Sequence, residues 1–177
     1  MEFELQTITE KTIREKTVNL KEALELYDLG KSKPFLLMAY ASEVRDYFKG
    51  KNISLCSIVN AKSGLCPENC KFCAQSAHYV TRAEVYPLMT KENILERAKE
   101  AKESGVGMFS IVTSGTRIEG EDEWKEIEEA IVGMVALGIK PCASIGMLDS
   151  ERAKRLKDVG LFRYHHNLET ARSNFDN

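Results

Sequence analysis

The chain has 177 residues, 43% of them hydrophobic, and 25 basic side chains against 27 acidic ones give a net charge of −2. The length suits one ordinary globular domain, and the charge gives no reason to expect electrostatic binding to nucleic acid or to an acidic membrane surface. Apolar runs such as Ile131–Ile139 are too short to span a bilayer, and the acidic N-terminus is unlike a secretory signal. We therefore expect a soluble, cytoplasmic protein.

The first 50 residues have the patterns of helices. Apolar residues recur three and four positions apart between Val18 and Tyr27, with Asn19 as a possible N-cap. Pro34 can open a second helix that runs to about Phe48 and ends at Gly50. We expect an N-terminal helical segment, residues 1–50, ahead of a main domain of residues 51–177.

From residue 51 onward, apolar runs alternate with amphipathic helices that end at glycines, as helix C-caps favour. The expected strands are 53–60, 108–113, 139–145 and 162–167, and the expected helices are 91–104, 121–137 and 150–159. This alternation predicts the α/β class, with right-handed βαβ units and a parallel sheet. Four such strands make about half of a (β/α)₈ TIM-type barrel, although an open doubly wound sheet would give a similar pattern.

In both architectures function gathers at the carboxyl ends of the strands. The segments expected there are 61–78, 114–117, 146–147 and 167–170. The first of them contains three of the five cysteines. The odd cysteine count and the lack of a signal sequence argue against a disulfide framework.

Cys66, Cys70 and Cys73 form a C-x₃-C-x₂-C pattern. Three thiolates on a short loop can hold one iron–sulfur cluster and leave one iron open to an exchangeable ligand. A structural zinc on the same cysteines and His78 is an alternative, and would make the protein a binding module without catalysis. A redox pair of Cys70 and Cys73 is a weaker alternative, because it leaves Cys66 unexplained.

The cysteine pattern, with the aromatic Phe72 before the last cysteine, resembles the signature of the radical S-adenosylmethionine superfamily. More narrowly, residues 70–76 (CKFCAQS) and 164–170 (YHHNLET) look like the biotin synthase family. The likeness extends from about Leu20 to the last residue. A related radical enzyme with another substrate is the alternative within the superfamily.

The resemblance implies a [4Fe–4S] cluster on the three cysteines, with S-adenosylmethionine chelating the fourth iron. One electron would cleave the sulfonium to a 5′-deoxyadenosyl radical, which abstracts hydrogen from dethiobiotin before sulfur is inserted to form biotin. It also implies an electron donor such as flavodoxin or ferredoxin, and a homodimer for the full-length protein.

The resemblance assigns further residues one by one. Those implied for the cofactor are Phe72, Thr113, Ser114, Asn167 and Glu169, and those implied for the substrate are Lys62, His165 and Asn167. For Gln75 and His78, a structural hydrogen bond and a direct role are both open. None of these residues is predicted to act as a catalytic acid or base.

The resemblance also implies a second cluster, a [2Fe–2S] centre, but this sequence departs from the family's usual ligands for it. Cys142 matches one of its ligands, but Ser110 stands where a second cysteine is expected, and a serine oxygen is a poorer ligand for iron–sulfur chemistry. His165 stands where asparagine often contacts the substrate, and Cys56 matches no ligand, so we expect it in the core. Because a whole barrel takes about 250 residues, we expect the chain to be an N-terminal portion that binds the first cluster but cannot complete the reaction alone.

Overall fold

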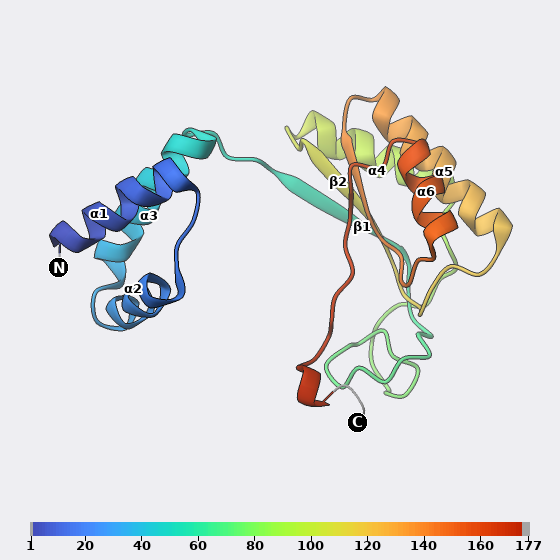
Figure 1. Ribbon diagram of the computed structural model, residues 1–177. Coiled ribbons are helices and arrows are strands. Elements are labelled where there is room, and N and C mark those ends of the chain that lie inside the picture. Colours follow the sequence, from blue (N-terminus) through green and yellow to red (C-terminus); the bar gives the residue numbers. More distant parts are fainter. Residues whose placement is uncertain (1, 175–177) are drawn as a thin grey trace. The chain divides into compact units, whose positions relative to one another are not determined.

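The structure is a computed structural model that describes residues 2–174, with side chains from residue 4 onward (Figure 1). The chain divides into two compact units, Met1–Ile53 and Ser54–Asn177. None of the described helices is both long enough and apolar enough to cross a membrane.

The N-terminal unit contains the helices α1 (Glu2–Glu15), α2 (Leu20–Ser32) and α3 (Pro34–Lys49). The two helices predicted in this segment are confirmed as α2 and α3, including the Asn19 cap, which forms a reciprocal capping box with Glu22. Pro34 opens α3, and Gly50 follows its end with a φ of +66°. The sequence did not single out α1, whose β-branched residues weaken the helical signal; it packs against α3 and buries Leu5.

The second unit is a parallel sheet covered by helices. Its strands are β1 (Cys56–Lys62), β2 (Met108–Thr113), β3 (Lys140–Ser144) and β4 (Arg163–Tyr164), hydrogen-bonded in that order. The helices α4 (Lys91–Glu103), α5 (Glu121–Ala136) and α6 (Ser150–Asp158) cover one face of the sheet, and a short 3₁₀ helix, η1 (Arg172–Asn174), follows (Figure 1).

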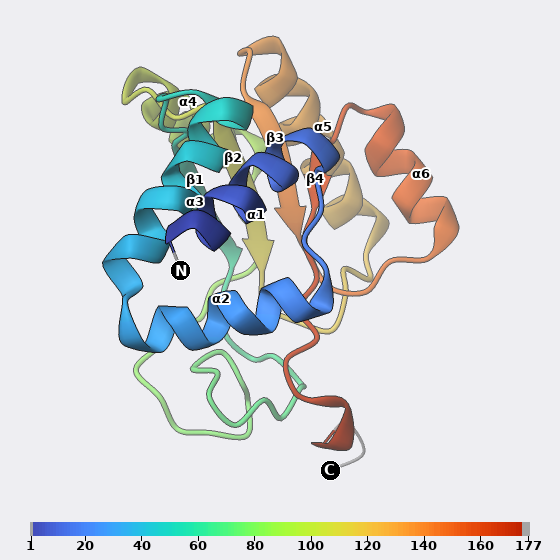
Figure 2. The ribbon, with the colours of Figure 1, turned by 60° about the vertical axis from the view of Figure 1, so that its left-hand side comes forward.

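This arrangement decides between the two expected architectures. A doubly wound sheet reverses its strand order and carries helices on both faces. Here the strand order is consecutive and the helices between the strands share one face, as in part of a (β/α)₈ barrel (Figure 2). The predicted parallel α/β fold is confirmed.

Three predicted strands differ at their ends, and β3 is shorter than expected by one residue at each end. β1 begins three residues later than expected and continues to Lys62. β4 has two residues instead of six, because its pairing is confined to Cys142 with Arg163 and Ala143 with Tyr164. The apolar pattern alone does not reveal where backbone pairing stops.

The core lies between the sheet and the helix layer. Phe109 and Ile111 of β2 belong to one buried cluster with Trp124 and Ile127 of α5. Alternate strand residues point the other way. On that opposite face a register row runs across the sheet through Ile58, Ser110, Cys142 and Arg163.

The face that carries this row is the one that α4, α5 and α6 do not cover, and it is called the open face here. Cys56 lies on it, two residues before Ile58 in β1, and is exposed. The expectation that it belongs to the core is therefore wrong. The physical reason is that α4, α5 and α6 cover only the other face of the sheet. An apolar residue type at a strand position does not tell which face is covered.

Candidate metal centre

Residues 63–78, here called the cysteine loop, follow β1 directly and carry Cys66, Cys70 and Cys73. The loop lies at the carboxyl end of the sheet, beside the segment that follows β4 (Figure 2). Because the strands are parallel, all their carboxyl ends meet at this edge. The predicted location of the cysteines is thus the one the fold provides.

The cysteine loop is held by its own backbone. The N–H of Cys66 donates to the carbonyl of Gln75 at 2.9 Å, and the N–H of Ala77 donates to the carbonyl of Cys66 at 2.8 Å. A tighter turn joins the Cys73 N–H to the Cys70 carbonyl at 2.9 Å. These bonds fold the loop back on itself, so that its three cysteines lie close together with their side chains partly buried.

The surroundings of Cys70 disfavour the thiolate form of its side chain. Burial raises the pKa of the Cys70 thiol most, and Glu169, Cys73, Cys66 and Glu68 raise it further. Each of these neighbours is an acid or another thiol. Ionising the cysteines would therefore concentrate negative charge, which a cationic iron–sulfur core would offset.

The zinc alternative fits the geometry poorly. Within residues 2–174, no three His, Cys, Asp or Glu side chains gather closely enough to hold a single metal ion. His78 is the fourth ligand expected for zinc, and its Nε2 atom lies 2.9 Å from the carbonyl oxygen of Pro67. The fourth ligand that the zinc alternative needs is thus engaged with the backbone of Pro67.

The residues expected to contact the cofactor divide into two groups. Phe72 is 74% exposed on the cysteine loop, and Asn167 and Glu169 are exposed in the segment after β4. Ser114, in contrast, is 8% exposed, and its hydroxyl donates to the carbonyl of Gly64 at 2.8 Å. The Oγ1 atom of Thr113 is buried and has no hydrogen-bond partner in the described part of the chain.

The two motifs that carry the family resemblance meet at this edge. Glu169, 96 residues beyond Cys73, lies near enough to Cys70 to affect the pKa of its thiol. Glu169 has a φ of +64°, a conformation that is uncommon for a residue other than glycine. Backbone strain of this kind gathers at functional sites.

Lys62 and His165, the two residues expected to contact only the substrate, have different surroundings. The Nζ atom of Lys62 is 2.7 Å from Oε1 of Glu123, in the first turn of α5. A register shift between Asn60 and Lys62 brings Lys62 beside Thr113 in the sheet. His165 is exposed, and its backbone N–H donates to the carbonyl of Ala143 at 2.8 Å.

The candidate ligand of a second cluster, Cys142, is 4% exposed in β3. Burial raises the pKa of its thiol most, Arg163 acts in the opposite direction, and Cys56 raises the pKa again. Ser110 is its register neighbour on β2. The structure therefore brings Cys142 together with Ser110, Arg163 and Cys56 on the open face of the sheet.

Tyr164 orders the turns at this edge, a role that the sequence did not reveal. Its hydroxyl accepts from the N–H of Ile145 at 3.3 Å and donates to the carbonyl of Gly146. Gly146, with a φ of +87°, packs so closely that a Cβ atom there would overlap the carbonyl oxygen of Thr116. The place of Tyr164 in the run YHHN, which resembles the family's motif, was the available signal, but its partners are set by the fold.

A second link joins the cysteine loop to the segment after β2. The hydroxyl of Thr116 donates to Oε1 of Glu68 at 2.5 Å, and the N–H of Met147 donates to the carbonyl of Thr116 at 2.8 Å. Three carboxyl-end segments of the sheet are thus tied together by hydrogen bonds.

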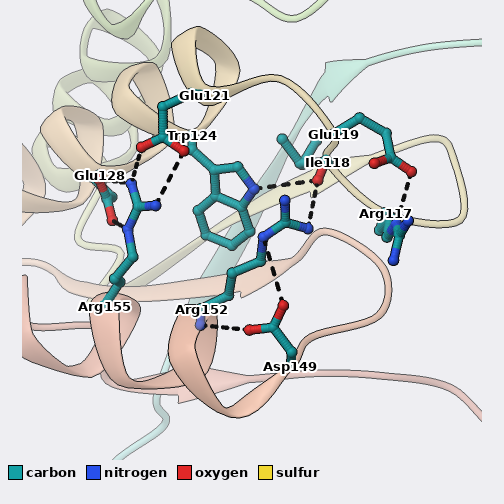
Figure 3. A network of polar contacts seen from close by, with 9 residues as sticks. All are labelled: Arg117, Ile118, Glu119, Glu121, Trp124, Glu128, Asp149, Arg152 and Arg155. Carbon is teal, nitrogen blue, oxygen red and sulfur yellow. Dashed lines mark hydrogen bonds and ion pairs between the residues drawn. The ribbon is translucent and has the colours of Figure 1, made fainter.

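The segment after β2 is also anchored to the helix layer. The carbonyl of Ile118 accepts from Nε1 of Trp124 at 3.2 Å and from Nη1 of Arg152 at 2.9 Å (Figure 3). Arg155 reaches both Glu121 and Glu128 of α5 (Figure 3). The guanidinium groups of Arg152 and Arg155 lie 5.1 and 5.6 Å from the centre of the Trp124 ring. This network holds α5 and α6 together around the buried indole.

The comparisons with known proteins agree with this geometry. The model of the radical SAM superfamily matches residues 62–176, which includes the cysteine loop and all four strand ends. The chain belongs to the radical SAM superfamily.

Within that superfamily, the curated relatives are biotin synthases. The one from Clostridioides difficile is 45% identical over the whole chain, and the one from Geotalea uraniireducens is 44% identical over the whole chain. These alignments cover 55% and 54% of the relatives, so the chain spans about half the length of the proteins it matches. A crystal structure of HydG, a maturase of the [FeFe]-hydrogenase, matches 91% of this chain and 36% of its own with a TM-score of 0.61. At 18% identity, that likeness shows the fold alone.

Proposed function

We propose that this chain carries the [4Fe–4S] and S-adenosylmethionine site of a biotin synthase, which inserts sulfur into dethiobiotin. The observation that supports this most is the meeting of two motifs: the cysteine loop and Glu169 of the YHHNLET segment lie together at the carboxyl edge of a parallel sheet. The identity to biotin synthases, over half of their length, supports the choice of substrate.

In this proposal Cys66, Cys70 and Cys73 hold the cluster, and a bound cluster with S-adenosylmethionine supplies one-electron radical chemistry. Asn167 and Glu169 bind polar groups of the cofactor, and Phe72 offers an apolar surface beside it. Ser114 serves differently from the first expectation, because its hydroxyl is already bonded to Gly64. We assign it to holding the loop.

The residues expected to contact the substrate also fall into two groups. His165 is exposed and free to contact a ligand, whereas Lys62 would first have to leave Glu123. We therefore keep His165 and Asn167 as substrate contacts and give Lys62 the alternative task of anchoring α5. The proposed partners are dethiobiotin, an electron donor of the flavodoxin or ferredoxin kind, and a second copy of the full-length protein.

Cys142 is the proposed protein ligand of an auxiliary cluster on the open face. Ser110 beside it is a poor iron–sulfur ligand, so we do not propose the usual pair of cysteines there.

The first experiment is anaerobic reconstitution of the chain with iron and sulfide, followed by metal and sulfide analysis. We expect about four irons and four sulfides for each chain, and a spectrum that changes when S-adenosylmethionine is added. Stoichiometric zinc without sulfide would contradict the proposal and favour the binding module.

A second experiment tests the substrate. A protein of the relatives' full length should form 5′-deoxyadenosine from S-adenosylmethionine only when dethiobiotin is present. Formation that does not depend on dethiobiotin would favour a related radical enzyme with another substrate.

A further inference from the structure

The side chain of Gln75 lies at the base of the cysteine loop, where the chain enters the loop and where it leaves. Its Oε1 atom accepts hydrogen bonds from the hydroxyl of Ser63 at 2.9 Å and from the N–H of Gly64 at 2.5 Å. Its backbone carbonyl accepts from the N–H of Cys66 at 2.9 Å. Gln75, two residues after the last cysteine, thus binds Ser63, Gly64 and Cys66, three of the four residues that end at the first cysteine.

This base of the loop is fixed to the sheet. The carbonyl of Gly64 accepts from the hydroxyl of Ser114 at 2.8 Å, and the N–H of Ser114 donates to the carbonyl of Lys62 at 2.9 Å. Ser63 is 5% exposed. If the acceptor at Gln75 were removed, water would have little access to replace it, so buried donors would lose their partner.

Two replacements of Gln75 separate its hydrogen-bond acceptor from its volume. The amide oxygen is the acceptor for Ser63 and Gly64. A carboxylate would supply the same acceptor geometry with an added negative charge. A leucine would fill a similar volume without any acceptor.

We infer that Gln75 is a positioning residue for the cluster: it fixes Cys66 against Cys73 by joining the two ends of the cysteine loop, an inference that rests on the proposed function. Gln75 does not ligate the metal in this scheme. It acts through Ser63, Gly64 and the backbone of Cys66, so that the three thiols are already arranged when the cluster binds.

The test compares three variants of the chain after anaerobic loading with iron and sulfide. Gln75→Leu removes the acceptor, Gln75→Glu keeps it, and Gln6→Leu is the matched control at the chain's other glutamine, which is exposed on α1 and bonded to Glu10. The measurements are the rate at which a chelator removes iron and the electron paramagnetic resonance spectrum of the reduced cluster with and without S-adenosylmethionine.

For Gln75→Leu we expect iron loss about ten- to a hundredfold faster than in the wild type, because two donors lose their acceptor. Its spectrum should also be broadened, since the thiols then adopt several arrangements. Gln75→Glu should release iron nearly as slowly as the wild type, and Gln6→Leu should match the wild type. Equal rates of iron loss for Gln75→Leu and the wild type would overturn the inference. So would a Gln75→Glu variant that loses iron as fast as Gln75→Leu.

Ser63→Ala provides a second variant that removes only one of the two donors. We expect intermediate iron loss, and a smaller effect of Gln75→Leu when Ser63 is already alanine. Additive effects in the double variant would contradict the shared hydrogen bond. If the wild type itself takes up no cluster, the proposed function fails, and this outcome is distinct from a loaded wild type that Gln75→Leu does not disturb.

Discussion

The helix layer and the cysteine loop are neighbouring regions of one unit, but they are built by different forces. The helix layer, which comprises α4, α5, α6 and the sheet face they cover, buries large apolar side chains such as Trp124, Phe109 and Ile127 completely. The residues that the cysteine loop buries are Ser63 and Ser76, both polar, while its Leu65 and Phe72 are exposed. Hydrogen bonds hold the loop, and apolar burial holds the layer. We conclude that global stability and cluster binding respond to different substitutions.

The largest expected effect is confined to the loop. Cys70→Ala should abolish cluster binding because a ligand is lost, while the helix content and the unfolding transition of the chain should stay close to those of the wild type. Cys56→Ala is the matched control, since Cys56 is exposed on the open sheet face. Iron and sulfide analysis after anaerobic reconstitution, with far-UV circular dichroism, gives both readouts. Equal cluster loss in the two variants would refute the assignment of the ligands.

The next largest effect concerns the helix layer. Trp124 is 1% exposed, so Trp124→Ala should lower the free energy of unfolding by about 3–5 kcal/mol through loss of buried area and creation of a cavity. Trp124→Phe should cost less, since it keeps a ring while losing the hydrogen bond to Ile118. Because Trp124 is the only tryptophan of the chain, urea unfolding is followed by circular dichroism. A Trp124→Ala variant as stable as the wild type would contradict the conclusion that apolar burial holds the helix layer.

A third substitution tests the border between loop and layer. Gly146→Ala should destabilise the unit by more than about 1–3 kcal/mol, the usual cost of a strained backbone conformation, since its Cβ would also overlap Thr116. Gly105 has a similar φ of +84° with no neighbour within 4 Å. Gly105→Ala therefore measures the backbone cost alone. Equal losses in urea unfolding for both variants would exclude the close packing of Gly146 against Thr116.

The smallest effect is electrostatic and depends on pH. The hydrogen bond from Arg155 is the main cause that lowers the pKa of Glu121 in the folded chain. This interaction therefore stabilises the fold above the unfolded-state pKa of about 4.3, and it is lost as the pH falls through the lower folded-state value. Arg155→Met should lower the urea midpoint at pH 7, and its difference from the wild type should shrink at pH 3.

Lys154→Met, at an exposed position on the same helix, is the control for the removal of one positive charge. A difference between wild type and Arg155→Met that does not change with pH would show that Arg155 acts by packing on Trp124 alone.

Much of the fold could be predicted because its signals are local. The helix boundaries at Asn19, Pro34 and Gly50 depend on capping and on allowed φ values, which neighbouring residues determine. β2 was predicted to the residue, since a glycine and a polar turn enclose its apolar run. β4 was overestimated, because the length of a strand depends on a partner that the local pattern does not contain.

The place of the candidate site could be predicted from the sequence, but the contacts that support its residues could not. The spacing of Cys66, Cys70 and Cys73 can be read directly, and it depends on short-range chain geometry. The partners of Lys62, Ser114 and Gln75 could not be read, since each lies across the loop or on another element.

The sequence by itself therefore determined the α/β class, the order of helices and strands, and the cysteine cluster, all of which follow from short-range periodicity, capping and spacing. Only the tertiary structure decided that the strands are consecutive in the sheet, that Cys56 is exposed, and that Glu169 approaches Cys70. The physical reason is that faces, edges and pairs of distant residues arise when parallel strands bring their carboxyl ends together. No local pattern of residues contains that information.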